Sequence, residues 1–146
     1  MVGHNGARRC GERGQALVEA ALVIPVLLLI VFGVVMAGRI SHAKVAVQAI
    51  AREASRELAT APSEDVGVSD ALGTARSAAD GYGLSQSRLT VDVNSNGFER
   101  GGTATARVTY QVGLGDLPLL GRVGVTVSSS HSERIDLYRS REAVLR

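Results

Sequence analysis

The chain contains few aromatic residues: it has no tryptophan, three tyrosines and two phenylalanines among 146 residues. Single-stranded nucleic acids are bound largely by stacking of bases on aromatic side chains, so the chain offers few platforms for that contact. Cys10 is the only cysteine, and no intramolecular disulfide can form. The three histidines, His4, His42 and His131, are scattered and show no metal-ligand spacing. The sequence therefore predicts neither a metal site nor another cofactor.

Patterns that would support catalysis are also weak. The glycine pattern at 113–115 is too short for a phosphate-binding loop, and no helical pattern follows it. The run Ser128–His131 is more typical of a polar strand end than of a nucleophile with its base. We therefore expect no enzymatic activity and no small-molecule substrate.

Positive charge is in slight excess, with 16 Lys and Arg against 14 Asp and Glu. The first 14 residues hold three arginines and one glutamate, so the rest of the chain is neutral overall. A basic surface that binds nucleic acid is therefore not expected. The first 14 residues are polar and rich in glycine, and we expect them to form a disordered cytoplasmic leader.

What the sequence has in abundance is one uncharged apolar stretch, AALVIPVLLLIVFGVVMAG at 20–38. As a helix it would be about 28 Å long, close to the ~30 Å hydrocarbon core of a bilayer. Its apolar residues surround the helix and leave no polar stripe, which is typical of a membrane span; the alternative is the core helix of a soluble protein. Pro25 lies one turn inside the stretch, and we expect it to bend the helix axis.

The helical pattern continues beyond the span. Apolar residues recur every three or four positions and leave polar residues on the other faces. These apolar positions are Ile40, Ala43, Val47, Ile50, Ala54 and Leu58. The spacing predicts one helix of about 45 residues, 16–59, that ends before Pro62, with APSEDVG at 61–67 as a linker.

The remaining residues predict a small α+β domain. A short helix is expected over 70–80, with Ser69 or Asp70 as its N-cap. Three segments alternate between apolar and polar residues, at 88–94, 103–112 and 122–130. Turn residues between them predict a three-stranded antiparallel meander, packed on the outer half of the long helix.

The loop between the last two strands is unusually apolar, since it carries Leu117, Leu119 and Leu120. We expect it to tuck beneath the sheet, to rest on the membrane or to meet a partner. The expected organisation is a leader at 1–14, a transmembrane segment at 15–38, an amphipathic stalk helix at 39–60 and an extracytoplasmic domain at 61–146.

The residues that lead into the span resemble those of a known protein family. The run GERGQALVEAALVIP at 11–25, the apolar helix and AREASR at 51–56 resemble the TadE family of pilin-like proteins, which belong to the tight-adherence (Flp) pilus system. Major pilins of that system carry a tyrosine directly after a glutamate at the start of the apolar helix. In this chain the matching glutamate, Glu19, is followed by Ala20, and the chain is longer than a major pilin. The resemblance therefore implies an accessory pseudopilin in pilus assembly rather than the main filament subunit.

In that family a membrane aspartic protease, the prepilin peptidase, cuts after a glycine that precedes the apolar helix, and a glutamate is fifth in the mature chain. The resemblance assigns these positions to Gly14, to the new N-terminus Gln15 and to Glu19. A charged side chain at the centre of a span costs about 2.5–3.5 kcal/mol, so Glu19 needs a partner or water. The freed amine of Gln15, on the same or a neighbouring subunit, would provide one.

The expected partners are membrane lipid, the prepilin peptidase, other pilin-like subunits and the pilus assembly platform. Lys and Arg lie on both sides of the span and do not decide the orientation; the resemblance favours a cytoplasmic N-terminus. Two alternatives stay open. One is an unprocessed signal anchor with an external partner-binding domain, and the other is a secreted domain that begins at Gly38 after signal-peptidase cleavage.

Overall fold

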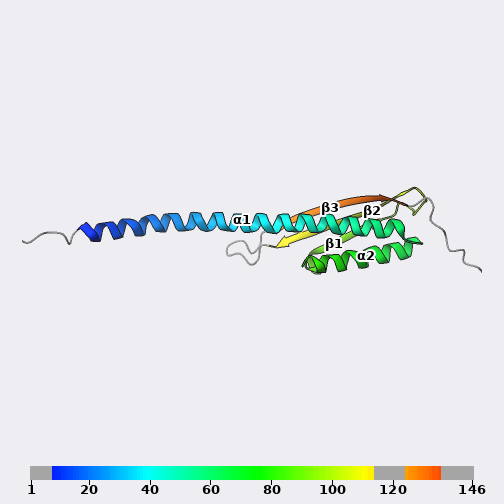
Figure 1. Ribbon diagram of the computed structural model, residues 1–146, viewed down its shortest axis with the longest axis horizontal. Helices are drawn as coiled ribbons and strands as arrows, with labels where there is room; N and C mark the ends of the chain where they lie inside the picture. The colour runs from blue at the N-terminus through cyan, green and yellow to red at the C-terminus, as the bar shows by residue number, and fades with distance from the viewer. Residues whose placement is uncertain (1–7, 114–123, 136–146) are drawn as a thin grey trace, which may run out of the picture. The chain divides into compact units, whose positions relative to one another are not determined.

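The computed structural model describes residues 8–113 and 124–135, with side chains described from Gly14 onward. Figure 1 shows a long helix, a shorter helix and a three-stranded antiparallel sheet, which confirms the predicted α+β class. The elements are α1 (Arg8–Thr60), α2 (Glu64–Gly81), the 3-10 helix η1 (Gln86–Arg88), β1 (Leu89–Asn94), β2 (Thr103–Gly113) and β3 (Gly124–Arg134). The chain divides into two compact units: unit 1 is Met1–Gly38 and unit 2 is Arg39–Arg146.

Helix α1 begins at Arg8, earlier than the predicted start near residue 16. The prediction of a disordered leader is therefore wrong for residues 8–14, and residues 1–7 lie outside the described part. Extending an existing helix adds one backbone hydrogen bond for each residue that is fixed, so the apolar helix propagates into a polar run without proline. Pro25 lies inside α1. The bend at Pro25 stays a prediction.

In unit 1 the apolar side chains of α1 are exposed on every side of the helix. Leu22 is 70% exposed and Leu29 is 71% exposed. Within the described residues one helix is long and apolar enough to cross a membrane, judged by length and composition, and none of its most apolar window is buried inside the structure. Burial would be expected of a soluble core helix, so the exposure favours the membrane interpretation.

The sheet of unit 2 is a meander with strand order β1-β2-β3, and both pairings are antiparallel, as predicted. Val91 pairs with Val108, and Val108 pairs with Ser129. Strand β2 lies in the centre of the sheet, and its alternate residues from Ala104 to Val112 are buried. Period-two alternation puts these residues on one face, which packs on the helices.

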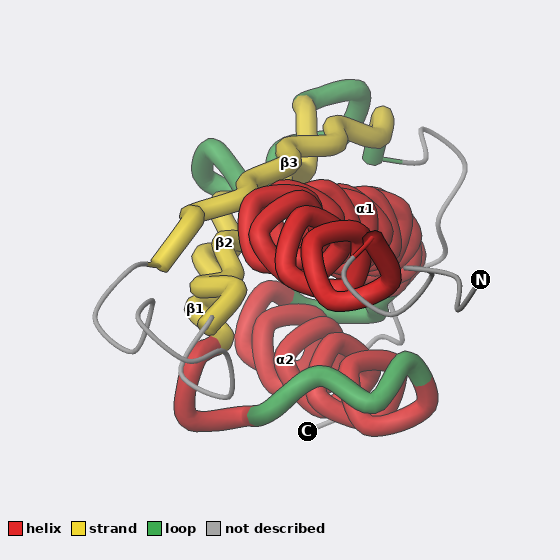
Figure 2. The backbone as a smooth tube through the Cα atoms, turned by 90° about the vertical axis from the view of Figure 1, so that its left-hand side faces the viewer, coloured by secondary structure: helices red, strands yellow, loops and turns green. Residues whose placement is uncertain are grey.

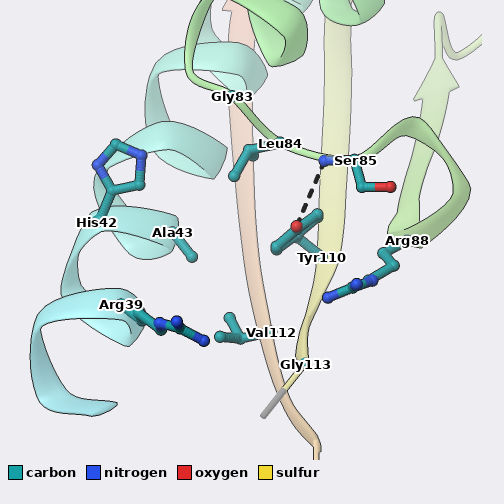
Figure 3. Close-up of a pocket in the computed structure, with 10 residues that line it drawn as sticks. All are labelled: Arg39, His42, Ala43, Gly83, Leu84, Ser85, Arg88, Tyr110, Val112 and Gly113. Carbon is teal, nitrogen blue, oxygen red and sulfur yellow. Dashed lines mark hydrogen bonds between the residues drawn. The ribbon is translucent and has the colours of Figure 1, made fainter. Parts of the chain in front are cut away.

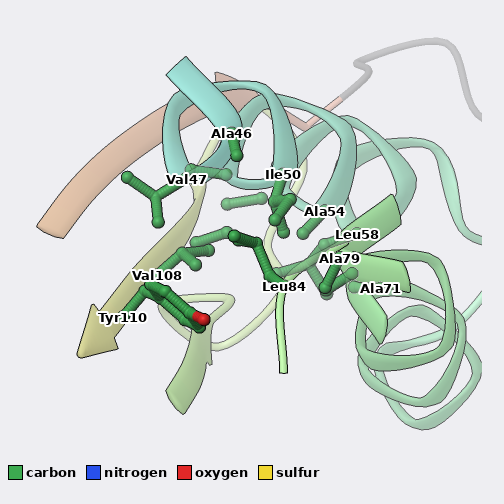
Figure 4. Close-up of a cluster of buried hydrophobic side chains, with 14 of the residues drawn as sticks. Ala46, Val47, Ile50, Ala54, Leu58, Ala71, Ala79, Leu84, Val108 and Tyr110 are labelled. Carbon is green, nitrogen blue, oxygen red and sulfur yellow. The ribbon is translucent and has the colours of Figure 1, made fainter. Parts of the chain in front are cut away.

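The core of unit 2 lies between this sheet and the two helices. Figure 2 shows the sheet on one side of α1 and α2, with β3 beside α1 and β1 beside α2. Figure 4 shows Ile50 and Leu58 of α1 directed toward the same core as Leu84 and Val108. Much of this core is alanine, including Ala71, Ala75 and Ala79 of α2. Small side chains at every fourth position let the helices approach closely.

Helix α2 begins at Glu64, so the predicted start near Asp70 is wrong. Ser63 has the extended backbone of an N-cap, and the acidic Glu64 and Asp65 in the first turn suit the positive end of the helix dipole. The predicted end was close, because the helix ends at Gly81. Gly83 then has a positive φ of 68°, a conformation that glycine adopts without strain.

Strand β3 extends to Arg134, beyond the predicted end at residue 130. Its last residues lack apolar alternation, and they are held by backbone pairing: Ala106 pairs with His131, and Ala104 pairs with Glu133. The predicted strand start at Arg122 and the apolar loop with Leu117, Leu119 and Leu120 lie outside the described residues.

Candidate functional site

The residues predicted to be processed lie on the N-terminal part of α1, in unit 1. Gly14 is exposed, and a Cβ added there would meet nothing within 4 Å. Its φ is not positive, so the backbone does not require glycine either. A glycine inside a helix costs about 0.5–1 kcal/mol relative to alanine. Neither packing nor backbone conformation within the described structure therefore accounts for glycine at this position.

Gln15 and Glu19 lie four residues apart on α1, which places them one above the other on the same helix face. Both residues are exposed. The Glu19 carboxylate makes no hydrogen bond or ion pair with any residue that the structure describes. The helix thus brings Gln15 and Glu19 together and leaves the carboxylate available to a group from outside this chain or to a new N-terminal amine.

The two histidines in the described part of the chain have structural neighbours. The Nε2 atom of His42 lies 3.0 Å from the carbonyl oxygen of Tyr82, and the two rings meet edge to face. The Nε2 atom of His131 lies 3.5 Å from a Glu133 carboxylate oxygen on the same strand. Across residues 14–113 and 124–135, no group of three or more His, Cys, Asp and Glu side chains could hold a metal ion.

Unit 2 also contains a cavity that sequence reasoning missed (Figure 3). Its volume is about 340 Å³, near the lower end of the roughly 300–1,000 Å³ typical of ligand pockets. Arg39 and His42 come from α1, and Arg88 comes from the last position of η1. Arg88 is far from Arg39 and His42 in the sequence, and the three residues fit no motif, so only the fold brings Arg88 to the other two.

Comparison with known families identifies the N-terminal part of the molecule. Residues 14–56 match the model of the family described as TadE-like protein. This segment is TadE-like. The family resemblance read from the sequence is thereby confirmed over these residues. They begin at the glycine of the expected processing position, include the span and end four residues before the end of α1.

A TadE-like segment is typical of a pilus-associated protein of the Tad system, a structural component that interacts with other pilus components. The apolar helix that overlaps the TadE-like segment fits a membrane-anchored chain. The match ends at residue 56, so α2 and the sheet lie outside it. No curated protein and no solved structure is significantly similar to the chain.

Proposed function

We propose that this chain is an accessory pilin-like subunit in the assembly of tight-adherence pili. It is made as a precursor, held in the cytoplasmic membrane with its N-terminus inside, and cut by a prepilin peptidase between Gly14 and Gln15. The observation that carries the proposal is the TadE-like match, which begins at Gly14 and continues into an apolar helix whose side chains are exposed. Exposed apolar helices of this kind associate side by side in lipid.

The surroundings of Gly14 support its role as the residue before the cut. Alanine would fit there without a clash and would make the helix more stable, so the glycine has a use outside the fold. A protease at the membrane face must draw the backbone into its site. Glycine helps because it has no side chain and because it lowers the free energy needed to unwind the helix.

The position of Glu19 supports its role in subunit packing. Its carboxylate lies next to the start of the span and has no partner among the described residues. Cleavage creates a positive amine on Gln15, one helical turn away. Pairing between this amine and Glu19 of the same or a neighbouring subunit offsets the desolvation of both charges and fixes the stagger between helices.

The processing step is tested with Gly14→Ala, and with Gly33→Ala as a matched control because Gly33 is also on α1 with open space around it. Full-length chains are co-expressed with a prepilin peptidase, and the cleaved fraction is measured by mass spectrometry. We expect Gly14→Ala to slow cleavage about tenfold or more, the discrimination that one methyl group gives in a tight site. Equal cleavage of both variants would overturn the assignment.

N-terminal sequencing of the membrane-extracted protein separates the proposal from its alternatives. A start at Gln15 supports prepilin processing. A start at Met1 or Val2 identifies an unprocessed signal anchor, and a start at Gly38 identifies a secreted domain. Either of the last two results contradicts the proposal.

The pairing step is tested with Glu19→Gln, which removes the charge and keeps the shape of the side chain. We expect normal membrane insertion and cleavage but loss of incorporation into the pilus machinery, measured by co-purification with other pilus components. Glu53→Gln is the control, because Glu53 is an exposed glutamate on α1 in unit 2. Undiminished incorporation of the Glu19→Gln chain would refute the pairing.

A further inference from the structure

We propose that unit 2 binds a second copy of this chain, with the arginine row of one copy set against the acidic groove of the next. The arginine row is Arg52 and Arg56 of α1. The acidic groove lies between α1 and α2, and its carboxylates are Glu53, Glu57 and Asp70. The inference rests on the proposed function in one respect, that subunits assemble with one another. It requires neither the cleavage step nor the pairing step at the span.

Like charges are stacked on the exposed face of α1. Arg52 and Arg56 are four residues apart, and so are Glu53 and Glu57, so each pair lies on one side of the helix. Like charges at this spacing slightly destabilise a helix, whereas opposite charges would stabilise it. All four side chains are exposed, and none makes an ion pair with a residue that the structure describes. The two pairs are therefore suited to opposite charges that come from another molecule.

The acidic groove lies between the two helices of unit 2, which Figure 2 shows side by side. Its volume is about 640 Å³, and among the described residues its lining includes three carboxylates and neither lysine nor arginine. The other lining residues, all from α2, have small side chains: Ser69, Gly73, Thr74, Ser77 and Ala78. A Cβ added at Gly73 would meet nothing within 4 Å. Long arginine side chains can therefore enter the groove and form charge-assisted hydrogen bonds with its carboxylates.

The arginine row belongs to a longer seam on α1. Val45, Ala49, Arg52 and Arg56 follow one another at steps of four, three and four residues, the spacing with which one helix packs along another. Val45 is 61% exposed, and Ala49 is partly exposed. Covering an exposed aliphatic side chain is favourable. The seam therefore offers apolar contact as well as positive charge to a neighbouring molecule.

The seam and the groove face different directions. Consecutive residues of a helix are about 100° apart around its axis, so the arginine row is separated by that angle from the row of Glu53 and Glu57. Because both rows have the same four-residue step, in parallel copies Arg52 can meet Glu53 while Arg56 meets Glu57. One copy can thus bind a neighbour through its seam and another through its groove. Such a heterologous contact forms rings or filaments rather than a closed dimer.

The test uses the full, uncleaved chain in micelles of a neutral detergent, with a dye on Cys10, the only cysteine. Labelled chain is mixed with increasing amounts of unlabelled chain, and sedimentation velocity gives the concentration at which half of it is associated. One variant carries Arg52→Glu and Arg56→Glu, and the other carries Glu53→Lys and Glu57→Lys. In each variant alone two attractive pairs become repulsive, so we expect this concentration to rise about tenfold or more. Mixing the two variants should restore association, because the unchanged arginine row of one meets the unchanged acidic groove of the other.

The matched control carries Arg76→Glu and Glu99→Lys, two exposed positions outside the seam and the groove, and it should associate like the unchanged chain. A single neutral change such as Glu53→Gln leaves two carboxylates in the groove, so it has little effect and still serves as the control for Glu19. The proposal is overturned if the unchanged chain does not associate, if either reversed variant associates as the control does, or if the mixture of the two variants stays apart. Because the chain is uncleaved, none of these results bears on processing at Gly14, and a failure of processing leaves this contact standing.

Discussion

The two units use apolar residues in opposite ways. In unit 1 large aliphatic side chains such as Leu22 and Leu29 surround α1 and are mostly exposed. In unit 2 the same helix buries one face, and that face consists largely of alanine with a few larger residues such as Ile50 and Leu58. The first pattern needs an apolar solvent, and the second needs a close neighbour of its own chain.

The contrast shows that overall hydrophobicity does not distinguish a span from a core. What distinguishes them is how apolar side chains are distributed around the helix, and how large they are. A stripe of alanine at 43, 46, 51 and 54 brings the α1 backbone close to the sheet and α2. A complete coat of leucine and valine instead presents apolar surface on every side of the helix, which suits contact with lipid.

The largest effect is expected for Leu58→Ala, because Leu58 is 0% exposed. Truncating a buried leucine lowers the free energy of unfolding by about 2–5 kcal/mol. Leu28→Ala, at a position 49% exposed in unit 1, should leave the stability of unit 2 unchanged. Hydrogen exchange of the Val108 amide in the full chain measures both. If both variants lose a similar amount of protection from hydrogen exchange at Val108, the apolar side chains of unit 1 support the core as much as those of unit 2 do, and the contrast between the units is wrong.

A charge in the span gives the next largest effect. Leu29→Arg should reduce membrane insertion, since an arginine at the centre of a span costs about 2.5–3.5 kcal/mol. Val45→Arg is the matched change in unit 2, where the side chain is 61% exposed, and it should leave insertion and folding nearly unchanged. Carbonate extraction of membranes measures the inserted fraction. If Leu29→Arg is inserted as completely as the unchanged chain, the helix does not span the bilayer.

The features that sequence predicts well here are those with a strong local signal. The span rests on 19 uncharged residues without a break, and the strands rest on clear alternation such as that of Val91 and Val93 with Asp92. The family resemblance, which the family model confirms over residues 14–56, rests on residues of one helix. Each of these signals is contained within a single element, so no knowledge of tertiary contacts is required.

The features that sequence missed depend on contacts between elements. The start of α2 was misplaced because Pro62 and Gly67 suggested a linker, whereas Gly67 is buried in the helix where it meets α1. The end of β3 was missed because its polar residues are held by pairing with β2 rather than by burial. The basic cavity joins Arg39 to Arg88, and their proximity exists only once the sheet and helices have packed.

The smallest of these effects distinguishes a glycine required by packing from a glycine with open space. A Cβ at Gly67 would lie 2.8 Å from Cβ of Ala61 and 3.1 Å from Cδ1 of Leu58, so Gly67→Ala should destabilise unit 2 by about 1–3 kcal/mol. Gly73→Ala, on the same helix with open space around it, should instead stabilise it by about 0.4–1 kcal/mol. Hydrogen exchange of the Ala75 amide measures both changes. The two changes in the free energy of unfolding must have opposite signs, because alanine favours the helix equally at both positions and only the contact with α1 differs. If both variants are less stable, α2 needs glycine for a reason other than its close approach to α1.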